Sequence, residues 1–224
     1  MGVSAASRHR KLALFGDEQE QHTDERMIER LLRLIGVPQP RIGYIPEASY
    51  LDRGPFGLKR DFYAGIGATL AVYFDEETPD GELGTLLECD AIHLSGGNTF
   101  TFLYWLRARG MLSILCKYVE EGGILIGVSA GSIMMTPSVS SAALCGDPPD
   151  PRLSDYSALG LVDFHFWPHF DPNRQLDAQE AEFVASLPDL YACAGGAGIV
   201  VDGDAIELFG AVDKYPTIKD SAAS

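Results

Sequence analysis

Short apolar runs alternate with helix-patterned segments over the first 130 residues of the chain. The strand-like runs cover residues 11–16, 41–46, 69–74, 91–95 and 123–127. The segments between them space their apolar residues three or four positions apart, which is typical of helices. Strands that are apolar almost throughout are buried on both faces of a sheet. We therefore expect an α/β fold, a single-domain three-layer sandwich with a mostly parallel sheet.

The pattern changes after about residue 158. Further strand-like pieces, which predict an added antiparallel portion, lie near 162–167, 190–193, 198–202 and 205–209. The stretch 137–157 is long, irregular and rich in Ser, Pro and Asp, and loops of that length are often functional. We expect one domain over 11–212, preceded by a disordered leader (1–10) and followed by a C-terminal tail (213–224).

The charge balance excludes several classes of partner. The 17 Lys and Arg against 32 Asp and Glu give a net charge of −15. Such a surface repels phosphate backbones and anionic lipid, so we expect neither nucleic acid nor a membrane as a partner. The chain has four cysteines, far apart and without a C-x-x-C pair: Cys89, Cys116, Cys145 and Cys193. This spacing indicates reduced thiols and a cytoplasmic protein, without a disulfide framework.

Residues 127–131 read Gly-Val-Ser-Ala-Gly, a G-x-S-x-G motif. The motif follows a predicted buried strand and precedes a predicted helix over 132–135, which is the context in which it carries a nucleophile. Flanking glycines let the chain turn sharply without a Cβ clash, and a helix N-terminus favours developing negative charge. Ser129 is therefore the candidate nucleophile; the alternative is a structural serine at a strand–helix turn.

A second glycine-rich turn ends the neighbouring predicted strand. Residues 94–99 read Leu-Ser-Gly-Gly-Asn-Thr. Bare glycine backbone at this place could direct an N–H at a tetrahedral intermediate. Asn98 or Thr99 could cap the following helix. The alternative is a plain strand-to-helix turn without a catalytic role.

A serine nucleophile needs a base, and the chain has five histidines. Three of them lie in the leader, near an early helix start and inside a strand: His9, His22 and His93. Of the other two we favour His169 over His165, because His169 follows Pro168 at a predicted strand end, where open α/β sheets place their sites. The two could form a metal pair with Asp171, but no further ligand is spaced nearby, so we expect no metal.

The base needs an orienting acid. The carboxylates between Ser129 and His169 are Asp147, Asp150, Asp155 and Asp163. Their spacing alone does not choose among them.

Three stretches together resemble the peptidase E family of serine peptidases. These are residues 92–100 (IHLSGGNTF), 126–131 (IGVSAG) and 168–170 (PHF). Members of that family are aspartyl dipeptidases, with cyanophycinases as relatives, and the similarity in arrangement covers roughly 11–210. The resemblance implies a fold like the class I glutamine amidotransferases, with Ser in place of Cys.

The resemblance also implies roles for individual residues. It places the nucleophile at Ser129, the base at His169, and the oxyanion donors at the backbone N–H groups of Gly97 and Ala130. Asp147 is implied as the acidic member of the triad.

Two further side chains complete the expected site. Asp171 is the rival acid, because His169-Phe170-Asp171 is similar to the His-x-Glu of the amidotransferases. Family members select an N-terminal aspartate through an arginine C-terminal to the histidine, and Arg174 is the natural candidate because it is the only Lys or Arg between His169 and Lys214.

We therefore expect a Ser-His-Asp peptidase that acts on short peptides, with dipeptides carrying an N-terminal aspartate as its substrates. No cofactor is implied, and the protein is expected to be a monomer or homodimer. One alternative is an esterase or other acyl hydrolase with the same triad. The other is a non-catalytic binding module of amidotransferase-like shape.

Overall fold

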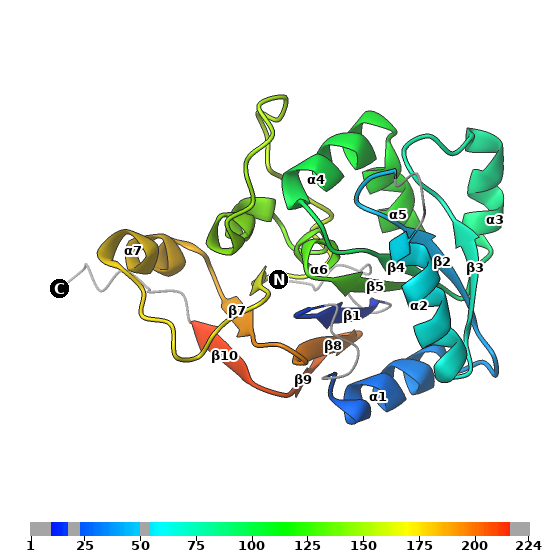
Figure 1. Cartoon of the computed structure of the whole chain (residues 1–224), viewed down its shortest axis with the longest axis horizontal. Coiled ribbons are helices and arrows are strands. Elements are labelled where there is room, and N and C mark those ends of the chain that lie inside the picture. Colours follow the sequence, from blue (N-terminus) through cyan, green and yellow to red (C-terminus); the bar gives the residue numbers. More distant parts are fainter. Residues whose placement is uncertain (1–9, 18–22, 50–53, 216–224) are drawn as a thin grey trace, which may run out of the picture.

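The computed structural model describes residues 10–17, 23–49 and 54–215, which form two β-sheets and the helices packed on them. The larger sheet contains β1 (Lys11–Phe15), β2 (Arg41–Ile45), β3 (Thr69–Tyr73), β4 (Ala91–Leu94), β5 (Ile124–Val128), β8 (Gly198–Asp202) and β9 (Ala205–Phe209). The smaller contains β6 (His165–Trp167), β7 (Leu190–Cys193) and β10 (Val212–Tyr215). Their strand orders are β3-β2-β4-β5-β1-β8-β9 and β10-β7-β6 (Figure 1).

The strand directions confirm a mostly parallel main sheet. The five strands from β3 to β1 pair in parallel, and only β8 and β9 run antiparallel to their neighbours. In the smaller sheet β10 is antiparallel to β7, but β6 runs parallel to β7. The predicted antiparallel addition is therefore wrong for β6. The chain between β6 and β7 includes the helix α7 (Ala178–Ser186), and a crossover of this kind returns the chain to a parallel partner.

Helices cover both faces of the main sheet. The other α-helices are α1 (Glu25–Ile35), α2 (Gly54–Gly65), α3 (Leu83–Leu87), α4 (Thr99–Ala108), α5 (Met111–Glu120) and α6 (Ala130–Ile133). The described residues also form the 3₁₀ helices η3 (Asp80–Glu82) and η4 (Val139–Cys145). In Figure 1, α1 and α2 lie on one side of the sheet and α4, α5 and α6 on the other, which gives the expected three layers. Among the described residues, no helix is long and apolar enough to cross a membrane.

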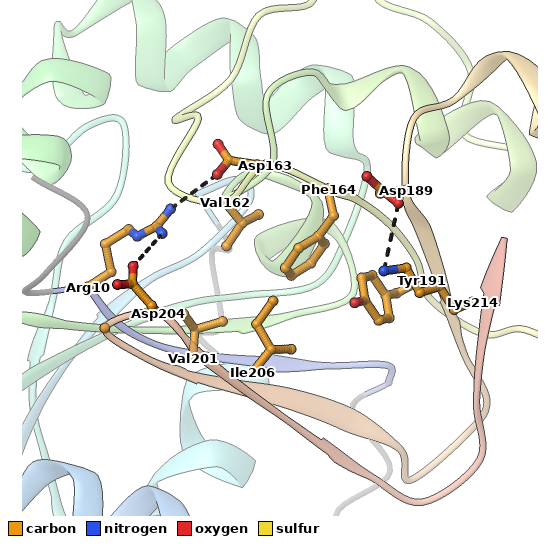
Figure 2. A pocket seen from close by; sticks show the side chains of 11 residues that line it. Arg10, Val162, Asp163, Phe164, Asp189, Tyr191, Val201, Asp204, Ile206 and Lys214 are labelled. Carbon is orange, nitrogen blue, oxygen red and sulfur yellow. Dashed lines mark ion pairs between the residues drawn. The ribbon is translucent and has the colours of Figure 1, made fainter. Parts of the chain in front are cut away.

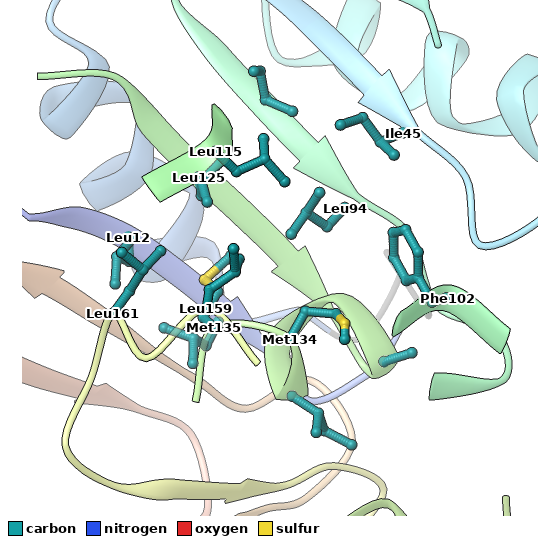
Figure 3. Close-up of a cluster of buried hydrophobic side chains, with 14 of the residues drawn as sticks. Leu12, Ile45, Leu94, Phe102, Leu115, Leu125, Met134, Met135, Leu159 and Leu161 are labelled. Carbon is teal, nitrogen blue, oxygen red and sulfur yellow. The ribbon is translucent and has the colours of Figure 1, made fainter. Parts of the chain in front are cut away.

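Alternate residues of the central strand β1 pack into two separate cores. Leu12 and Leu14 belong to the larger hydrophobic cluster, on the side of α4 to α6, which Figure 3 shows in part. Ala13 and Phe15 belong to the second cluster, with residues of α1 and α2. Burial of both faces explains why β1, β4 and β5 read as continuous apolar runs. The edge strand β3 is partly exposed.

Two predicted irregular segments contain regular structure. Val212–Tyr215 forms β10, so the first residues assigned to the C-terminal tail pair with β7. The predicted loop 137–157 includes η4, whose Val139 is fully buried. Of the predicted leader only Arg10 lies within the described residues, and its side chain donates to Leu161 O at 2.8 Å.

Candidate active site

The G-x-S-x-G motif forms a sharp turn between β5 and α6. Ser129 has φ 51° and ψ −109°, a backbone conformation that a residue with a side chain rarely adopts. A Cβ on Gly131 would lie 2.1 Å from Leu94 O, and one on Gly127 would lie 2.6 Å from the Gly131 backbone. The turn therefore tolerates only glycine at these two positions, and it presents the half-buried Ser129 at the carboxyl edge of the sheet.

The structure brings Ser129 and His169 together. Ser129 Oγ lies 2.7 Å from His169 Nε2, within hydrogen-bonding distance. Both residues are held by the end of β1, because Ser129 N–H donates to Phe15 O at 3.0 Å and His169 N–H donates to Gly16 O at 3.2 Å. His169 also has a positive φ of 56° and an exposed side chain. The pair is a serine beside a base that can accept its proton.

The other described histidines lie in the interior. His93 is 2% exposed and its Nδ1 lies 2.9 Å from Tyr63 Oη. Burial, together with the nearby positive charge of Lys59, holds the pKa of His93 well below its usual value. His165 is also buried, and this burial lowers its pKa although a hydrogen bond with the Ser138 backbone opposes the shift. The described residues contain no group of three or more His, Cys, Asp or Glu suited to a metal ion.

The glycine-rich turn after β4 carries Gly97, one of the two predicted oxyanion donors, in a conformation that requires glycine. Gly97 has φ 130°, and a Cβ there would lie 2.7 Å from the Glu47 side chain. Neither Gly97 N–H nor Ala130 N–H donates a hydrogen bond to another described group. Asn98 caps α4, because its side chain accepts from Thr101 N–H at 2.8 Å.

Asp147 lies between the predicted oxyanion loop and the chain that carries His169. Its Oδ2 accepts a hydrogen bond of 2.8 Å from Thr99 N–H, at the start of α4. Two residues earlier, Cys145 Sγ lies 3.9 Å from Pro168 O. In the described structure no hydrogen bond joins Asp147 to His169, so the third triad role stays a prediction.

The rival carboxylates contact groups other than His169. Asp171 Oδ1 accepts from Asn173 N–H at 2.9 Å and from its side-chain amide at 3.2 Å. Asp155 Oδ1 accepts from Ser157 N–H at 2.9 Å. Asp163 is almost fully exposed, 4.0 Å from the Arg10 guanidinium.

Two arginines are candidates for binding a substrate carboxylate: Arg174, the expected one, and Arg152, in the loop before His169. Both make their contacts with groups other than Ser129. The Arg174 guanidinium donates to Leu144 O at 3.3 Å, forms an ion pair with Glu180, and lies 5.6 Å from the centre of the Trp167 ring. The Arg152 guanidinium forms an ion pair of 2.5 Å with Asp150 and lies 3.6 Å from the centre of the Tyr104 ring. That either one binds a substrate carboxylate stays a prediction.

A separate cavity of about 340 Å³ lies beside the two sheets (Figure 2). Apolar side chains line its floor, and ion pairs of Arg10 and Lys214 lie at its rim. Its residues are Arg10, Val162, Asp163, Phe164, Asp189, Tyr191, Val201, Gly203, Asp204, Ile206 and Lys214. None of the predicted catalytic residues is among them.

Sequence reasoning missed the contribution of β1 to this site. The carbonyls of Phe15 and Gly16 accept hydrogen bonds from Ser129 and His169. Every residue has a backbone carbonyl, so residue type does not predict which carbonyls take part. The one available signal is the position of Gly16 at the end of a predicted strand, beside the others at the same edge of the sheet.

Comparisons with known proteins show which family the chain belongs to. The family model for "Peptidase family S51" matches residues 12–209. An uncharacterized peptidase of Listeria innocua, Lin0382, is 33% identical over 138 residues, which are 58% of this chain and 64% of that protein. A peptidase E of Nostoc sp. is 28% identical over 194 residues, covering 81% of this chain and 77% of that protein.

The fold is also found among solved structures. That of a candidate peptidase E from Listeria monocytogenes EGD-e superposes with a TM-score of 0.72 at 24% identity, covering 89% of this chain and 98% of that one. That of a peptidase from an acI-B1 Actinobacterium gives a TM-score of 0.66 at 17% identity, covering 95% and 97%. The family match spans most of the chain, including both glycine-rich turns and His169, and the chain belongs to peptidase family S51, whose members are serine peptidases.

Proposed function

We propose that this protein hydrolyses short peptides, with Ser129 as the nucleophile and His169 as the general base. The observation that carries the proposal is the 2.7 Å contact between Ser129 Oγ and His169 Nε2 on a strained strand–helix turn. A non-catalytic module has no need for a positive φ at a serine, which costs on the order of 1–3 kcal/mol.

The proposed chemistry proceeds by acyl transfer. Ser129 Oγ attacks the scissile carbonyl carbon while its proton passes to His169 Nε2. The N–H groups of Gly97 and Ala130 stabilise the negative charge on the carbonyl oxygen. His169 then gives the proton to the leaving amine, and water, deprotonated by the same imidazole, hydrolyses the acyl-enzyme.

Asp147 is the carboxylate that we propose to orient the His169 ring. Its Oδ2 is anchored by Thr99 N–H, and the contact of Cys145 with Pro168 brings its segment beside the histidine. Asp171 is turned toward Asn173. Apo structures often show catalytic hydrogen bonds as long or incomplete, and the Asp147–His169 bond would form when substrate closes the site.

Dipeptides with an N-terminal aspartate are the substrates we propose. The support is the similarity to several proteins named peptidase E, together with the implied role of an arginine after the histidine. In a chain of net charge −15, a substrate carboxylate needs a local cation. Arg174 supplies one, and Glu180 is then the group that the substrate carboxylate would have to displace.

A panel of Xaa-Leu dipeptides with all twenty residues at the first position tests the substrate class. We expect Asp-Leu to have the highest kcat/KM. A protein that cleaves p-nitrophenyl acetate but none of the dipeptides would be an esterase. A protein whose Ser129 reacts with no fluorophosphonate probe, under conditions that label a known serine hydrolase, would be a binding module.

The role of Arg174 is tested by its replacement with Met. We expect kcat/KM for Asp-Leu to fall by about 30-fold or more, since a carboxylate would be left without its partner, while activity on Ala-Leu changes little. Arg152→Met is the comparison variant, because Arg152 is the other candidate: an Asp-Leu loss in Arg152→Met but not in Arg174→Met would assign the substrate carboxylate to Arg152. Equal losses on both substrates in Arg174→Met would instead assign Arg174 to holding Leu144 and Glu180 in place.

A further inference from the structure

Ser95, the residue after β4, is a buried serine that the proposed mechanism does not use. It is 3% exposed and takes part in four hydrogen bonds. Its N–H donates to Ile45 O at 3.0 Å, and its carbonyl accepts from Gly131 N–H at 2.9 Å. Its hydroxyl accepts from Glu47 N–H at 2.8 Å and donates to Gly96 O at 2.7 Å. Three separate segments therefore meet at one residue.

One of these bonds joins the two glycine-rich turns. Gly131 follows Ala130, whose N–H is a proposed oxyanion donor, and its own N–H is fixed on Ser95 O. The chains are so close at this point that a Cβ on Gly131 would lie 2.1 Å from Leu94 O. The distance between the two turns is thus set by backbone contact at Ser95.

Glu47 connects Ser95 to Gly97, because its backbone bonds to Ser95 and its side chain packs on Gly97. The Glu47 backbone is clamped on both sides, by the Ser95 hydroxyl at its N–H and by Trp105 Nε1 at its carbonyl, 2.8 Å away. Its side chain, in a residue only 8% exposed, packs directly on Gly97, where a Cβ would lie 2.7 Å from Glu47 Cβ, Cγ and Oε2. Gly97 therefore rests against a side chain whose own backbone cannot shift without breaking the bonds to Ser95 and Trp105.

We propose that Ser95 is a positioning residue that holds the N–H groups of Gly97 and Ala130 at the separation an oxyanion requires. The inference rests on the proposed function, in which these two groups bind the oxyanion. Donors must lie within about 2.7–3.1 Å of the developing charge, and a misplacement of about 1 Å can cost roughly 10²-fold in rate. Without the hydroxyl, the hydrogen bonds that Ser95 makes with Glu47 N–H and Gly96 O are lost, and the oxyanion loop can shift.

The test is Ser95→Ala, assayed on the best dipeptide and with a fluorophosphonate probe. We expect kcat to fall by about 30- to 100-fold with KM within about twofold, because the oxyanion forms only in the transition state. The rate of labelling of Ser129 should fall by a similar factor. The matched control is Ser141→Ala, which removes a fully buried hydroxyl that has no hydrogen-bond partner in the described structure. Its kcat should be unchanged.

The outcomes separate this inference from the proposed function. A wild-type protein that is not labelled, or labelling that survives in Ser129→Ala, would overturn the proposed function and the inference with it. Labelling and kcat at wild-type level in a destabilised Ser95→Ala would make Ser95 merely structural.

If Ser95→Ala does not fold, Trp105→Phe removes the other clamp on Glu47 and keeps an aromatic ring. We then expect a smaller fall in kcat, again without a change in KM. An unchanged kcat in this variant, or a KM that rises as kcat falls, would overturn the positioning role.

Discussion

The two glycine-rich turns, 94–98 and 127–131, and the segment 137–177 supply the candidate site by different physical means. In the turns, the proposed functional groups are backbone N–H groups and one hydroxyl. Their positions depend on close contacts of glycines that leave no room for a Cβ. In the segment the proposed functional groups are side chains, above all that of His169, which lies just after β6 and whose Nε2 is 2.7 Å from Ser129 Oγ. In the turns, close backbone packing fixes the positions of the atoms. In the segment, the hydrogen bonds and ion pairs of each side chain fix them.

This difference decides what residue identity can reveal. Gly131, whose Cβ position lies against Leu94 O, can be recognised from the sequence because it is a glycine just after a predicted strand. A carboxylate such as Asp147 could pair with any of several groups, and its observed partner, Thr99 N–H, lies 48 residues away in the chain. Backbone packing in the turns and side-chain pairing in the segment should therefore respond differently to substitution.

The largest effect is expected from Ser129→Ala, which removes the hydroxyl that the two regions share. We expect kcat to fall by about 10⁶, the magnitude found for triad serines elsewhere, while the melting temperature changes little, because alanine keeps the same Cβ and therefore the same backbone strain. Dipeptide hydrolysis and fluorophosphonate labelling measure it, with the exposed Ser113→Ala as the control. More than a few per cent of residual activity would remove Ser129 from the nucleophile role.

Asp147→Asn tests the segment 137–177. As the orienting acid, Asp147 should lose about 10⁴ in kcat on this change, because an amide favours the wrong imidazole tautomer. Asp171→Asn should change kcat far less, since Asp171 is bound to Asn173. The alternative role of Asp147 is only to accept from Thr99 N–H at the start of α4, and its loss would then cost about 1 kcal/mol of stability with kcat preserved.

Gly131→Ala tests the shape of the turns, with Gly84→Ala as its match. A Cβ at Gly131 would lie 2.1 Å from a backbone carbonyl, which cannot move without displacing β4. We expect a loss of about 3 kcal/mol or more in the free energy of unfolding. Gly84 lies in α3 with nothing within 4 Å of its Cβ position, so alanine there should stabilise by about 0.5–1 kcal/mol. Similar values for the two in urea denaturation would contradict the steric account.

The sequence predicts much of the fold and the local part of the site. Four of the five parallel strands can be recognised because both of their faces are buried, whereas the edge strand β3 is partly exposed. Ser129 can be recognised because a strand, two glycines and a helix surround it. The hydrogen bonds of Phe15 and Gly16, the contacts of Ser95 and the parallel pairing of β6 all join segments that are distant in the chain. Such pairings depend on which chains pass close together, and no local pattern encodes that.

The smallest effect concerns the buried histidines, one beside each region. His93 lies in β4, before the first turn, and His165 in β6 within the segment. Burial lowers the pKa of both, and more strongly that of His93. In the unfolded chain each would bind a proton below about pH 6.5, whereas the folded protein keeps His93 neutral. The unfolded state therefore binds more protons, and stability is lost as the pH falls from 7 toward 5.

Urea denaturation of the wild type, His93→Gln and His165→Gln between pH 7 and 5 measures this loss. His93 should account for a slope of at most about 1.4 kcal/mol per pH unit, which His93→Gln should remove. His165→Gln should remove less, because the pKa of His165 is lowered less, and its hydrogen bond with the Ser138 backbone favours the charged form. If the two variants lose the same slope, the interior around β6 disfavours a charged histidine as strongly as the interior around β4 does. An unchanged slope in both would mean that carboxylates alone cause the acid sensitivity.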